Sequence, residues 1–257
     1  MGTVKRPALS MRLEAIVKML SSDGAHYQLA ADIGCDHGFT SIALILDGAA
    51  DRMIASDVRQ GPLSRAEEHV KDSGLSDRID VILSDGMKHL KREEKPQAAL
   101  ITGMGGFLII DIITDAEKRG ALPDVLLLQP QSGIEEVRRC IRDLGYCIFD
   151  EDMVKEDGKF YSIIKCIRSA GRKSEDTIEK MPDIDGVQKA DDLPQRIKDR
   201  FGPVLLEKKN PVLMEFLNKR LKICTGILEG IPSGSDRDEM ISSIEDIRLA
   251  LLHDRLR

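Results

Sequence analysis

The chain has 257 residues, of which 42% are hydrophobic, enough to bury one substantial core and to carry a smaller appendage. A formal net charge of −6 excludes a polycation that coats nucleic acid nonspecifically, although it leaves room for a local basic patch. No apolar run approaches the length of a membrane-spanning helix, and the five cysteines form no CxxC pair. We therefore expect a cytoplasmic protein with reduced thiols, no metal site and no membrane partner.

Helical and strand-like patterns alternate along the first two thirds of the chain. An amphipathic helix is predicted over Leu9–Leu20, where apolar residues recur on one face. Five short apolar strands are predicted after it, at Leu29–Ile33, Met53–Ser56, Ile79–Leu83, Ala98–Thr102 and Val125–Gln129. Helices are predicted between or after them at Thr40–Leu46, Pro62–Ser73, Phe107–Lys118 and Ile134–Leu144. This alternation is typical of a βαβ fold with a parallel sheet.

The rest of the chain has a different pattern. Cys147–Val154 and Lys159–Ile167 flank a turn that contains glycine, which predicts an antiparallel hairpin that closes an α/β domain over residues 1–168. The polar stretch over residues 169–193 is interpreted as a linker. Pro211–Leu228 and Asp236–Leu256 then show helical spacing of apolar residues around a turn rich in Gly and Pro. We expect a helical, coiled-coil-like hairpin within residues 194–257.

The sharpest motif follows the first strand and reads Asp-Ile-Gly-Cys-Asp-His-Gly from Asp32 to Gly38. A dinucleotide-binding loop has three glycines as GxGxxG and faces a pyrophosphate, whereas this segment has two glycines. The carboxylate of Asp32 would repel a pyrophosphate but suits the cationic amino acid end of S-adenosylmethionine. Gly34 and Gly38 allow the backbone to turn sharply and to approach such a cofactor. The alternative interpretation is an ordinary strand-to-helix turn of another α/β protein.

Acidic or glycine-rich clusters also follow the next three strands. Asp57 lies where an acidic side chain accepts hydrogen bonds from ribose hydroxyls in a Rossmann-like site, and Asp85 where a carboxylate can accept from an adenine amino group. Gly-Met-Gly-Gly, from Gly103 to Gly106, ends the fourth strand. Each acidic residue alone is equally explained by a turn or a helix cap. Because all the clusters follow strands of one parallel sheet, together they predict a Rossmann-like class I methyltransferase fold that binds S-adenosylmethionine.

The fourth cluster also bears on the methyl acceptor. An amino-methyltransferase typically has Asn or Asp, two prolines and an aromatic residue here, whereas Gly103–Gly106 offers backbone groups and space but no carboxamide. This favours a ring nitrogen as the nucleophile, since such a nitrogen has its own lone pair and needs positioning more than deprotonation. The glycines are also explained by a tight turn with close helix packing, and the two interpretations are compatible.

These motifs and their neighbours form a recognisable set. It comprises Met11-Arg12-Leu13, Asp32–Gly38, Asp57-Val58 with Gly61-Pro62, Asp85-Gly86, Gly103–Gly106, Gln129-Pro130-Gln131 and Gly158-Lys159-Phe160-Tyr161. The set resembles the bacterial tRNA adenine-N1-methyltransferases that modify the twenty-second nucleotide, in the D-loop region. The resemblance runs from about Leu9 to Cys166, and Phe201-Gly202-Pro203 with the following helices is similar to that family's C-terminal helical domain. Gln131 stands where the family more usually has Asn, and Cys35 where it has a small Ser-like residue.

The resemblance implies methyl transfer from S-adenosylmethionine to N1 of an adenine in tRNA, which leaves positive charge on the base. A carboxylate beside the ring would stabilise that charge, and we assign this role to Asp36, with His37 orienting it or moving a proton. The competing interpretation is structural, with Asp36 capping the helix near Thr40 and His37 packing over the cofactor loop. The expected cofactor-binding residues are Asp32, Gly34, Cys35, Gly38, Asp57, Val58, Asp85, Gly86, Gly103, Met104 and Gly105.

Four further residues are expected to bind the substrate at the rim of the acceptor pocket. They are Arg12, Gln129, Pro130 and Tyr161. Tyr161 would stack on an extruded base, although an aromatic residue in a closing hairpin equally fits the core.

A basic segment is expected to bind tRNA although the whole chain is acidic. Between Arg196 and Lys222 the chain carries eight basic and three acidic residues. We predict a tRNA-docking surface that includes Lys208, Lys209 and Lys219, although a solvated helix face would have the same composition. Charge reversal at these three lysines is expected to weaken tRNA binding and to leave cofactor affinity intact.

Two other functions stay open on the sequence alone. One is an S-adenosylmethionine-dependent methyltransferase that acts on a small molecule or a protein, and the other is a non-catalytic tRNA-binding protein with the same fold. A nicotinamide-dependent dehydrogenase is disfavoured because the third glycine of its loop is missing. The expected oligomeric state is a monomer or a weak dimer.

Overall fold

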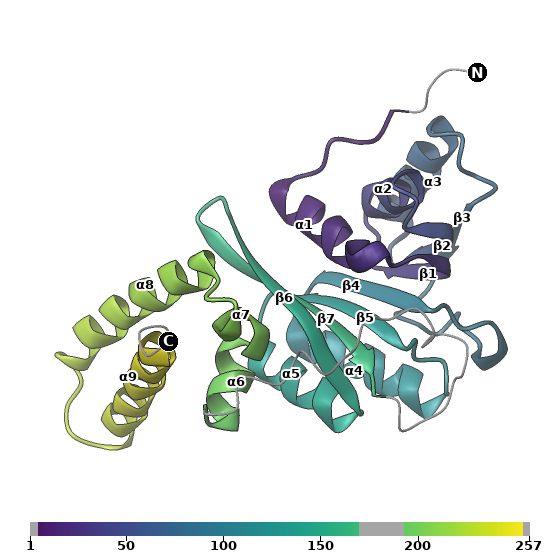
Figure 1. The fold of residues 1–257 in the computed structure, drawn as a ribbon. Coiled ribbons are helices and arrows are strands. Elements are labelled where there is room, and N and C mark those ends of the chain that lie inside the picture. Colours follow the sequence, from purple (N-terminus) through teal and green to yellow (C-terminus); the bar gives the residue numbers. More distant parts are fainter. Residues whose placement is uncertain (1–4, 170–192, 254–257) are drawn as a thin grey trace.

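The computed structural model describes residues 5–169 and 193–253, and a seven-stranded sheet flanked by helices forms its centre (Figure 1). The strands are β1 (Tyr27–Ile33), β2 (Ala50–Asp57), β3 (Ile79–Leu83), β4 (Ala98–Met104), β5 (Val125–Pro130), β6 (Tyr146–Glu156) and β7 (Lys159–Arg168). The flanking helices are α1 (Met11–Leu20), α2 (Phe39–Leu46), α3 (Gln60–Asp72), α4 (Gly106–Lys118) and α5 (Ile134–Asp143), with short 3₁₀ turns at Ser22–Gly24 and Arg92–Glu94.

The strand order is β3-β2-β1-β4-β5-β7-β6. Strands β1 to β5 are parallel, whereas β7 is antiparallel to both β5 and β6. The order reverses between β1 and β4, and open α/β sheets bind ligands outside the carboxyl ends of the strands at such a switch point. The predicted parallel sheet closed by an antiparallel hairpin is therefore confirmed.

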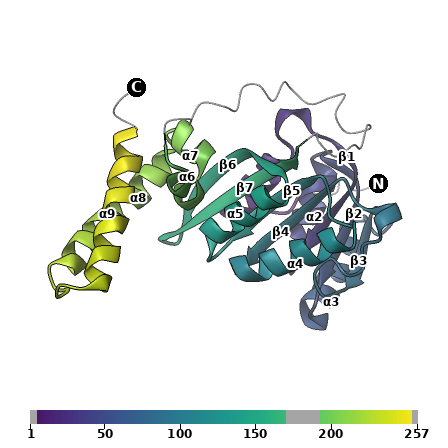
Figure 2. The same ribbon diagram turned by 90° about the horizontal axis from the view of Figure 1, so that it is seen from below.

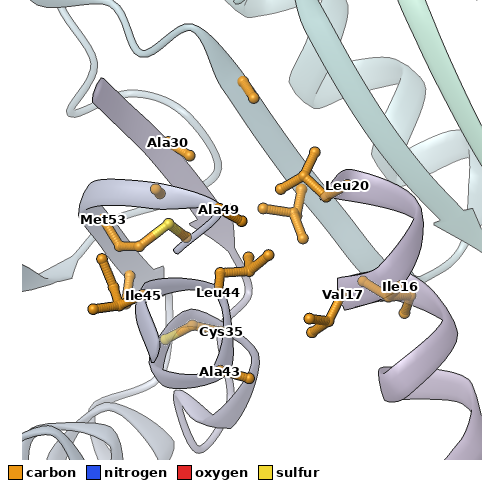
Figure 3. Packing of buried hydrophobic residues seen from close by; sticks show 14 of the residues in the cluster. Ile16, Val17, Leu20, Ala30, Cys35, Ala43, Leu44, Ile45, Ala49 and Met53 are labelled. Atoms are coloured by element: carbon orange, nitrogen blue, oxygen red, sulfur yellow. The ribbon is translucent and has the colours of Figure 1, made fainter. Parts of the chain in front are cut away.

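Alternate residues of the central strands contribute to two cores, one on each face of the sheet. On one face, Ala30 of β1 and Met53 of β2 belong to a cluster with residues of α1, α2 and α3, among them Leu44 (Figure 3). On the other face, α4 and α5 cover the sheet (Figure 2), and Ala31 and Ile101 belong to a cluster with residues of these helices. Because helices cover both faces, the central strands are apolar almost throughout rather than alternating.

Four helices follow the sheet in the described residues. They are α6 (Gln195–Phe201), α7 (Pro203–Glu207), α8 (Pro211–Leu228) and α9 (Ser235–His253). Helices α8 and α9 form a hairpin at the β6 end of the sheet, far from β3 (Figures 1 and 2). Their apolar side chains form a third core together with Met153 of β6. The predicted hairpin is confirmed, whereas the sequence pattern does not predict α6 and α7.

A buried ion pair joins this helical part to the sheet. Nε of Arg138 in α5 donates to Glu151 of β6 at 2.7 Å, and both side chains are almost fully buried. Arg138 also donates to the carbonyl of Asp199, and the second oxygen of Glu151 accepts from the backbone N–H of Val204. A Cβ on Gly202 would lie 2.6 Å from that oxygen, and its φ of 92° is left-handed, so glycine is needed here.

The predicted element boundaries differ from the observed ones by a few residues. The helix predicted from Leu9 begins at Met11, because the side chain of Ser10 caps it by accepting from the backbone N–H of Leu13. The predicted linker over residues 169–193 lies almost wholly outside the described residues. Within residues 5–169 and 193–253, no helix is both long enough and apolar enough to cross a membrane.

Candidate active site

The loop after β1 contains two glycines with left-handed backbone. Gly34 has a φ of 76°, and a Cβ there would lie 2.2 Å from the side chain of Met104, so glycine lets the end of β4 approach the loop. Gly38 has a φ of 73° and is the N-cap of α2, and a Cβ there would lie 3.2 Å from Ala66 of α3. Gly38 therefore contributes to helix packing, and its contact with a cofactor stays a prediction.

A cavity of about 440 Å³ opens at the carboxyl ends of β1, β2, β3 and β4. It brings together most of the residues that the sequence singled out. These are Arg12, Asp32, Gly34, Cys35, Asp36, His37, Asp57, Val58, Asp85, Gly86, Gly103 and Met104. The predicted contacts Gly38, Gly105, Gln129, Pro130 and Tyr161 are not among the described residues that line the cavity.

Asp32 is the most deeply buried carboxylate of the cavity, with 2% of its surface exposed. The pKa of Asp32 is raised to about 6, mainly by burial and to a lesser extent by the nearby Asp57 carboxylate, while a hydrogen bond from Ser41 at 2.9 Å opposes the shift. A carboxylate in this setting is stabilised by a cationic ligand, since a positive charge compensates for the lost hydration.

Two more carboxylates follow the strands on the β3 side of the cavity. Asp57 is buried at the end of β2 and accepts a hydrogen bond from the backbone N–H of Arg59 at 2.8 Å. Asp85 follows β3, is exposed, and forms an ion pair with Lys88. The interpretation of Asp57 as a turn residue is correct, because its carboxylate stabilises the turn, and the same residue lines the cavity.

Asp36 and His37 lie at the turn between β1 and α2. Asp36 has a left-handed φ of 50°, its side chain is 60% exposed, and one carboxylate oxygen lies 3.7 Å from Nε2 of His37. The N-cap of α2 is Gly38, and no side chain caps that helix. The interpretation of Asp36 as a helix cap is therefore wrong. His37 also packs near Phe39, with 6.0 Å between the ring centroids.

Polar side chains from three distant segments meet on the β5 side of the cavity. Nη1 of Arg12 in α1 donates to Oε1 of Gln129 at 2.8 Å, and the backbone N–H of Gly103 donates to the same oxygen at 3.1 Å. The guanidinium of Arg12 lies 5.0 Å from the ring centroid of Tyr161, and Glu156 accepts from the backbone N–H of Arg12. Gln129 and Tyr161 thus contact Arg12, and their binding of the substrate stays a prediction.

Sequence reasoning does not single out several of the residues that the fold brings to this region. Glu156 contacts Arg12, and Gln131, Thr102 and Leu108 line the cavity. Within the motif Gln129-Pro130-Gln131, the prediction selects Gln129, which is fully buried in the structure, rather than Gln131, which is exposed. Alternation along a strand places residues two apart on the same face, so the sequence alone does not separate them.

The three predicted tRNA-binding lysines lie near the start and along the length of α8. Lys208 forms an ion pair with Asp150 of β6, and Nζ of Lys219 lies 5.6 Å from the ring centroid of Phe160. Lys209 is exposed between α7 and α8. All three therefore present charge to solvent, although two of them also contact the sheet.

No cluster of His, Cys, Asp and Glu that could hold a metal ion occurs in the part of the chain that the structure describes. The five cysteines are free thiols. Burial raises the pKa of the Cys35 and Cys166 thiols, so neither is a reactive thiolate.

A family model described as TrmK, tRNA (adenine(22)-N(1))-methyltransferase, matches residues 30–250 of this chain. The chain belongs to the TrmK family. This match confirms the predicted family and the predicted methylation of N1 of adenine 22 in tRNA, and the observed sheet with its helical hairpin confirms the predicted fold class. The tRNA (adenine(22)-N(1))-methyltransferase of Bacillus subtilis (strain 168) is 28% identical over 246 residues, which cover 95% of each chain.

Two solved structures of relatives have the same fold. The Bacillus subtilis m1A22 tRNA methyltransferase TrmK is 26% identical with a TM-score of 0.78, over 95% of this chain and 98% of the relative. Streptococcus pneumoniae Sp1610, in complex with S-adenosyl-L-methionine, is 27% identical with a TM-score of 0.76, over 95% of this chain and all of the relative. The similarity therefore includes the helical hairpin as well as the sheet.

Proposed function

We propose that the cavity at the strand ends is where this TrmK protein transfers the methyl group of S-adenosylmethionine to N1 of adenine 22 in tRNA. The observation that carries this proposal is the row of carboxylates Asp85, Asp57 and Asp32 along the ends of β3, β2 and β1. S-adenosylmethionine supplies an electrophilic methyl group on a sulfonium. The chain must then bind this cofactor, orient the adenine and stabilise the charge that appears on the base.

The groups in the cavity fit the cofactor from one end to the other. Asp32 suits the ammonium of its amino acid end, Asp57 the ribose hydroxyls and Asp85 the adenine amino group. Val58 is 62% exposed beside Asp57 and offers apolar surface to the adenine ring. This order along the sheet leaves the β4 and β5 side of the cavity for the acceptor base.

On the acceptor side, we assign Asp36 to the stabilisation of charge. N1 of adenine attacks with its own lone pair, so the reaction needs no general base and benefits from a carboxylate near the ring. Asp36 is exposed in the cavity, and His37 lies within 3.7 Å to orient it. Arg12 is held by Gln129, which places a fixed cation where a phosphate of the nucleotide can bind.

The β6–β7 hairpin connects this cavity to α8. Glu156 and Tyr161 contact Arg12, while the adjacent Lys155 forms an ion pair with Glu215 of α8. Phe160 next to Tyr161 packs against α8 as well, at 5.4 Å between its ring centroid and that of Phe216. A tRNA bound along α8 can therefore place one nucleotide at Arg12, which supports tRNA docking by this surface.

We assign methyl transfer to residues 1–168 and tRNA docking to residues 194–257. The recognition of tRNA is expected to depend on shape, because the target adenine must leave a folded region. The free thiols are compatible with the reducing cytoplasm. A monomer or weak dimer stays the prediction for the oligomeric state.

A methylation assay tests these assignments. The protein is incubated with S-adenosylmethionine and unmodified tRNA, and the tRNA is digested and analysed by mass spectrometry. We expect N1-methyladenosine at nucleotide 22, and we expect Asp36→Ala to lower kcat about 100-fold while the Kd of the cofactor stays within about twofold. Asp36→Asn, which keeps the shape without the charge, should lose nearly as much.

Other results would contradict the proposal in distinct ways. Equal loss of cofactor binding and kcat in Asp36→Ala would place that residue in the cofactor site. An unchanged kcat in Asp36→Asn would mean that its charge does not act on the base. Methylation of a small molecule or a protein, with tRNA left unmodified, would support the alternative acceptor.

A further inference from the structure

One polar side chain of the cavity has no role in the proposed methyl transfer. Gln131 follows the end of β5 and contributes the single carboxamide among the described residues that line the cavity. A Cβ on Gly103 would lie 3.9 Å from Nε2 of Gln131, so the carboxamide of Gln131 lies over the glycine-rich end of β4. Its neighbour Gln129 differs, because Oε1 of Gln129 already accepts from both Arg12 and Gly103.

The backbone around Gln131 is firmly held. Its N–H donates to the carbonyl of Met104 at 2.8 Å, and the N–H of Gly106 donates to the carbonyl of Ser132 at 2.9 Å. A Cβ on Gly106 would lie 2.2 Å from that same carbonyl oxygen, so α4 and this loop are in close contact. Meanwhile the carboxamide of Gln131 is exposed and makes no hydrogen bond with another described residue. A side-chain carboxamide on a fixed backbone, with its hydrogen-bonding groups available, is suited to binding a ligand.

The chemistry of methylation at N1 restricts how an adenine can be recognised. Because N1 must present its lone pair to the methyl group, no protein donor can occupy that position. The N6 amino group and N7 are still available on the other edge of the base. A glutamine carboxamide matches that edge with two hydrogen bonds, since Oε1 accepts from N6 and Nε2 donates to N7.

Building on the proposed function, we propose that Gln131 selects the target adenine by hydrogen bonding to its N6 amino group and N7. This pairing leaves N1 free and orients the ring in its own plane. Guanine is rejected, because O6 replaces the amino donor and N1 carries a proton instead of a lone pair. A site built to pair with a polar group discriminates strongly against a base that lacks it, because its own polar atoms are then left unpaired.

An atom-specific substrate change tests this proposal. We compare kcat/KM on tRNA with adenosine or with 7-deazaadenosine at nucleotide 22, which replaces N7 with a carbon that accepts no hydrogen bond. The wild type is expected to lose about tenfold on the 7-deaza substrate. Gln131→Ala is expected to lose about as much on adenosine and to show a ratio near one between the two substrates.

The isosteric variant Gln131→Glu is expected to reverse the preference between the two substrates. Its carboxylate still accepts from N6 but repels the lone pair of N7, so this variant should methylate the 7-deaza substrate faster than adenosine. The Kd of S-adenosylmethionine and the Tm should be unchanged in both variants, since Gln131 is exposed. A wild-type ratio near one, or the same ratio in Gln131→Ala as in the wild type, would overturn the proposal while leaving methylation at nucleotide 22 intact. Absence of methylation on the adenosine substrate would instead overturn the proposed function itself.

Discussion

Asp32 shows how one residue of this site reduces stability in the absence of cofactor. Its carboxylate is almost fully buried and has Ser41 as its hydrogen-bond donor. The folded protein raises the pKa of Asp32 to about 6 from 3.8, so folding favours the protonated form. The contribution to stability is therefore complete below about pH 4 and is lost as the pH rises through about 6. At neutral pH the buried charge destabilises the ligand-free protein.

We predict that Asp32→Asn stabilises the ligand-free protein and impairs cofactor binding. At about pH 7.5 the variant no longer buries a charge, and the free energy of unfolding should rise by about 2 kcal/mol. The gain should shrink towards about pH 5, where the wild-type carboxyl is mostly protonated. Thermal unfolding at both pH values and calorimetric titration with S-adenosylmethionine measure the two effects.

Ser41→Ala is the matched control for Asp32→Asn. It removes the hydrogen bond that favours the charged carboxylate, so Tm should fall more at about pH 7.5 than at about pH 5. An Asp32→Asn variant with the wild-type Tm at both pH values would mean that Asp32 is solvated in the ligand-free protein.

At the scale of elements, the sequence predicts the strands and helices whose apolar residues recur at a regular period. It misses the short helices that are stabilised by tertiary contacts. All seven strands and the helices between them are long enough for their pattern of apolar residues to be recognised in the sequence. Helices α6 and α7 span seven and five residues, too short to show a helical period. Their ends are instead satisfied by Arg138 and Glu151, which lie far away in the sequence. The same limit hides Glu156 and Gln131, whose roles depend on which strand ends meet.

The Arg138–Glu151 pair is predicted to fix the helical part to the sheet. Glu151→Ala leaves Arg138 buried without its partner and removes the acceptor for the α7 N-terminus, so the free energy of unfolding should fall by about 3–5 kcal/mol. The double variant Arg138→Met with Glu151→Leu should recover part of this loss, because no charge is then buried unpaired. Urea denaturation of the single and double variants measures the difference.

Arg139 provides a control on the same helix as Arg138. Its ion pair with Glu135 is half-exposed, so Arg139→Met should change the free energy of unfolding by less than about 0.5 kcal/mol. If Arg138→Met and Arg139→Met had equal effects, the buried pair would not be the joint between the helical part and the sheet.

At the scale of the molecule, the acidic chain places Lys208 and Lys219 against the β6–β7 hairpin, which also contacts Arg12 at the cavity. The carboxyl ends of the strands, the β6–β7 turn and the start of α8 lie in one continuous region. The helices α3 and α4 end at the opposite edge of the sheet, because helices in βαβ units run antiparallel to their strands. Lysines at those ends, such as Lys71 and Lys118, are exposed but distant from the cavity.

This asymmetry predicts which lysines bind tRNA. Charge reversal at Lys208 would also repel Asp150, so neutral variants separate tRNA binding from packing better. We expect Lys208→Gln, Lys209→Gln and Lys219→Gln together to weaken tRNA binding more than about tenfold, without changing the Kd of S-adenosylmethionine. The slope of log Kd against log salt should fall by about one for each phosphate that the variant no longer neutralises.

A variant with Lys71→Gln and Lys118→Gln is the control for Lys208, Lys209 and Lys219, since it removes charge at the far edge of the sheet. Filter binding with unmodified tRNA at several salt concentrations measures both variants. If binding depended only on general electrostatic attraction, the affinity would fall in proportion to the number of charges removed, whichever edge of the sheet carried them. A docking surface on α8 instead requires that the far-edge variant keep the wild-type salt slope, because lysines that bind no phosphate release no counterions when tRNA binds.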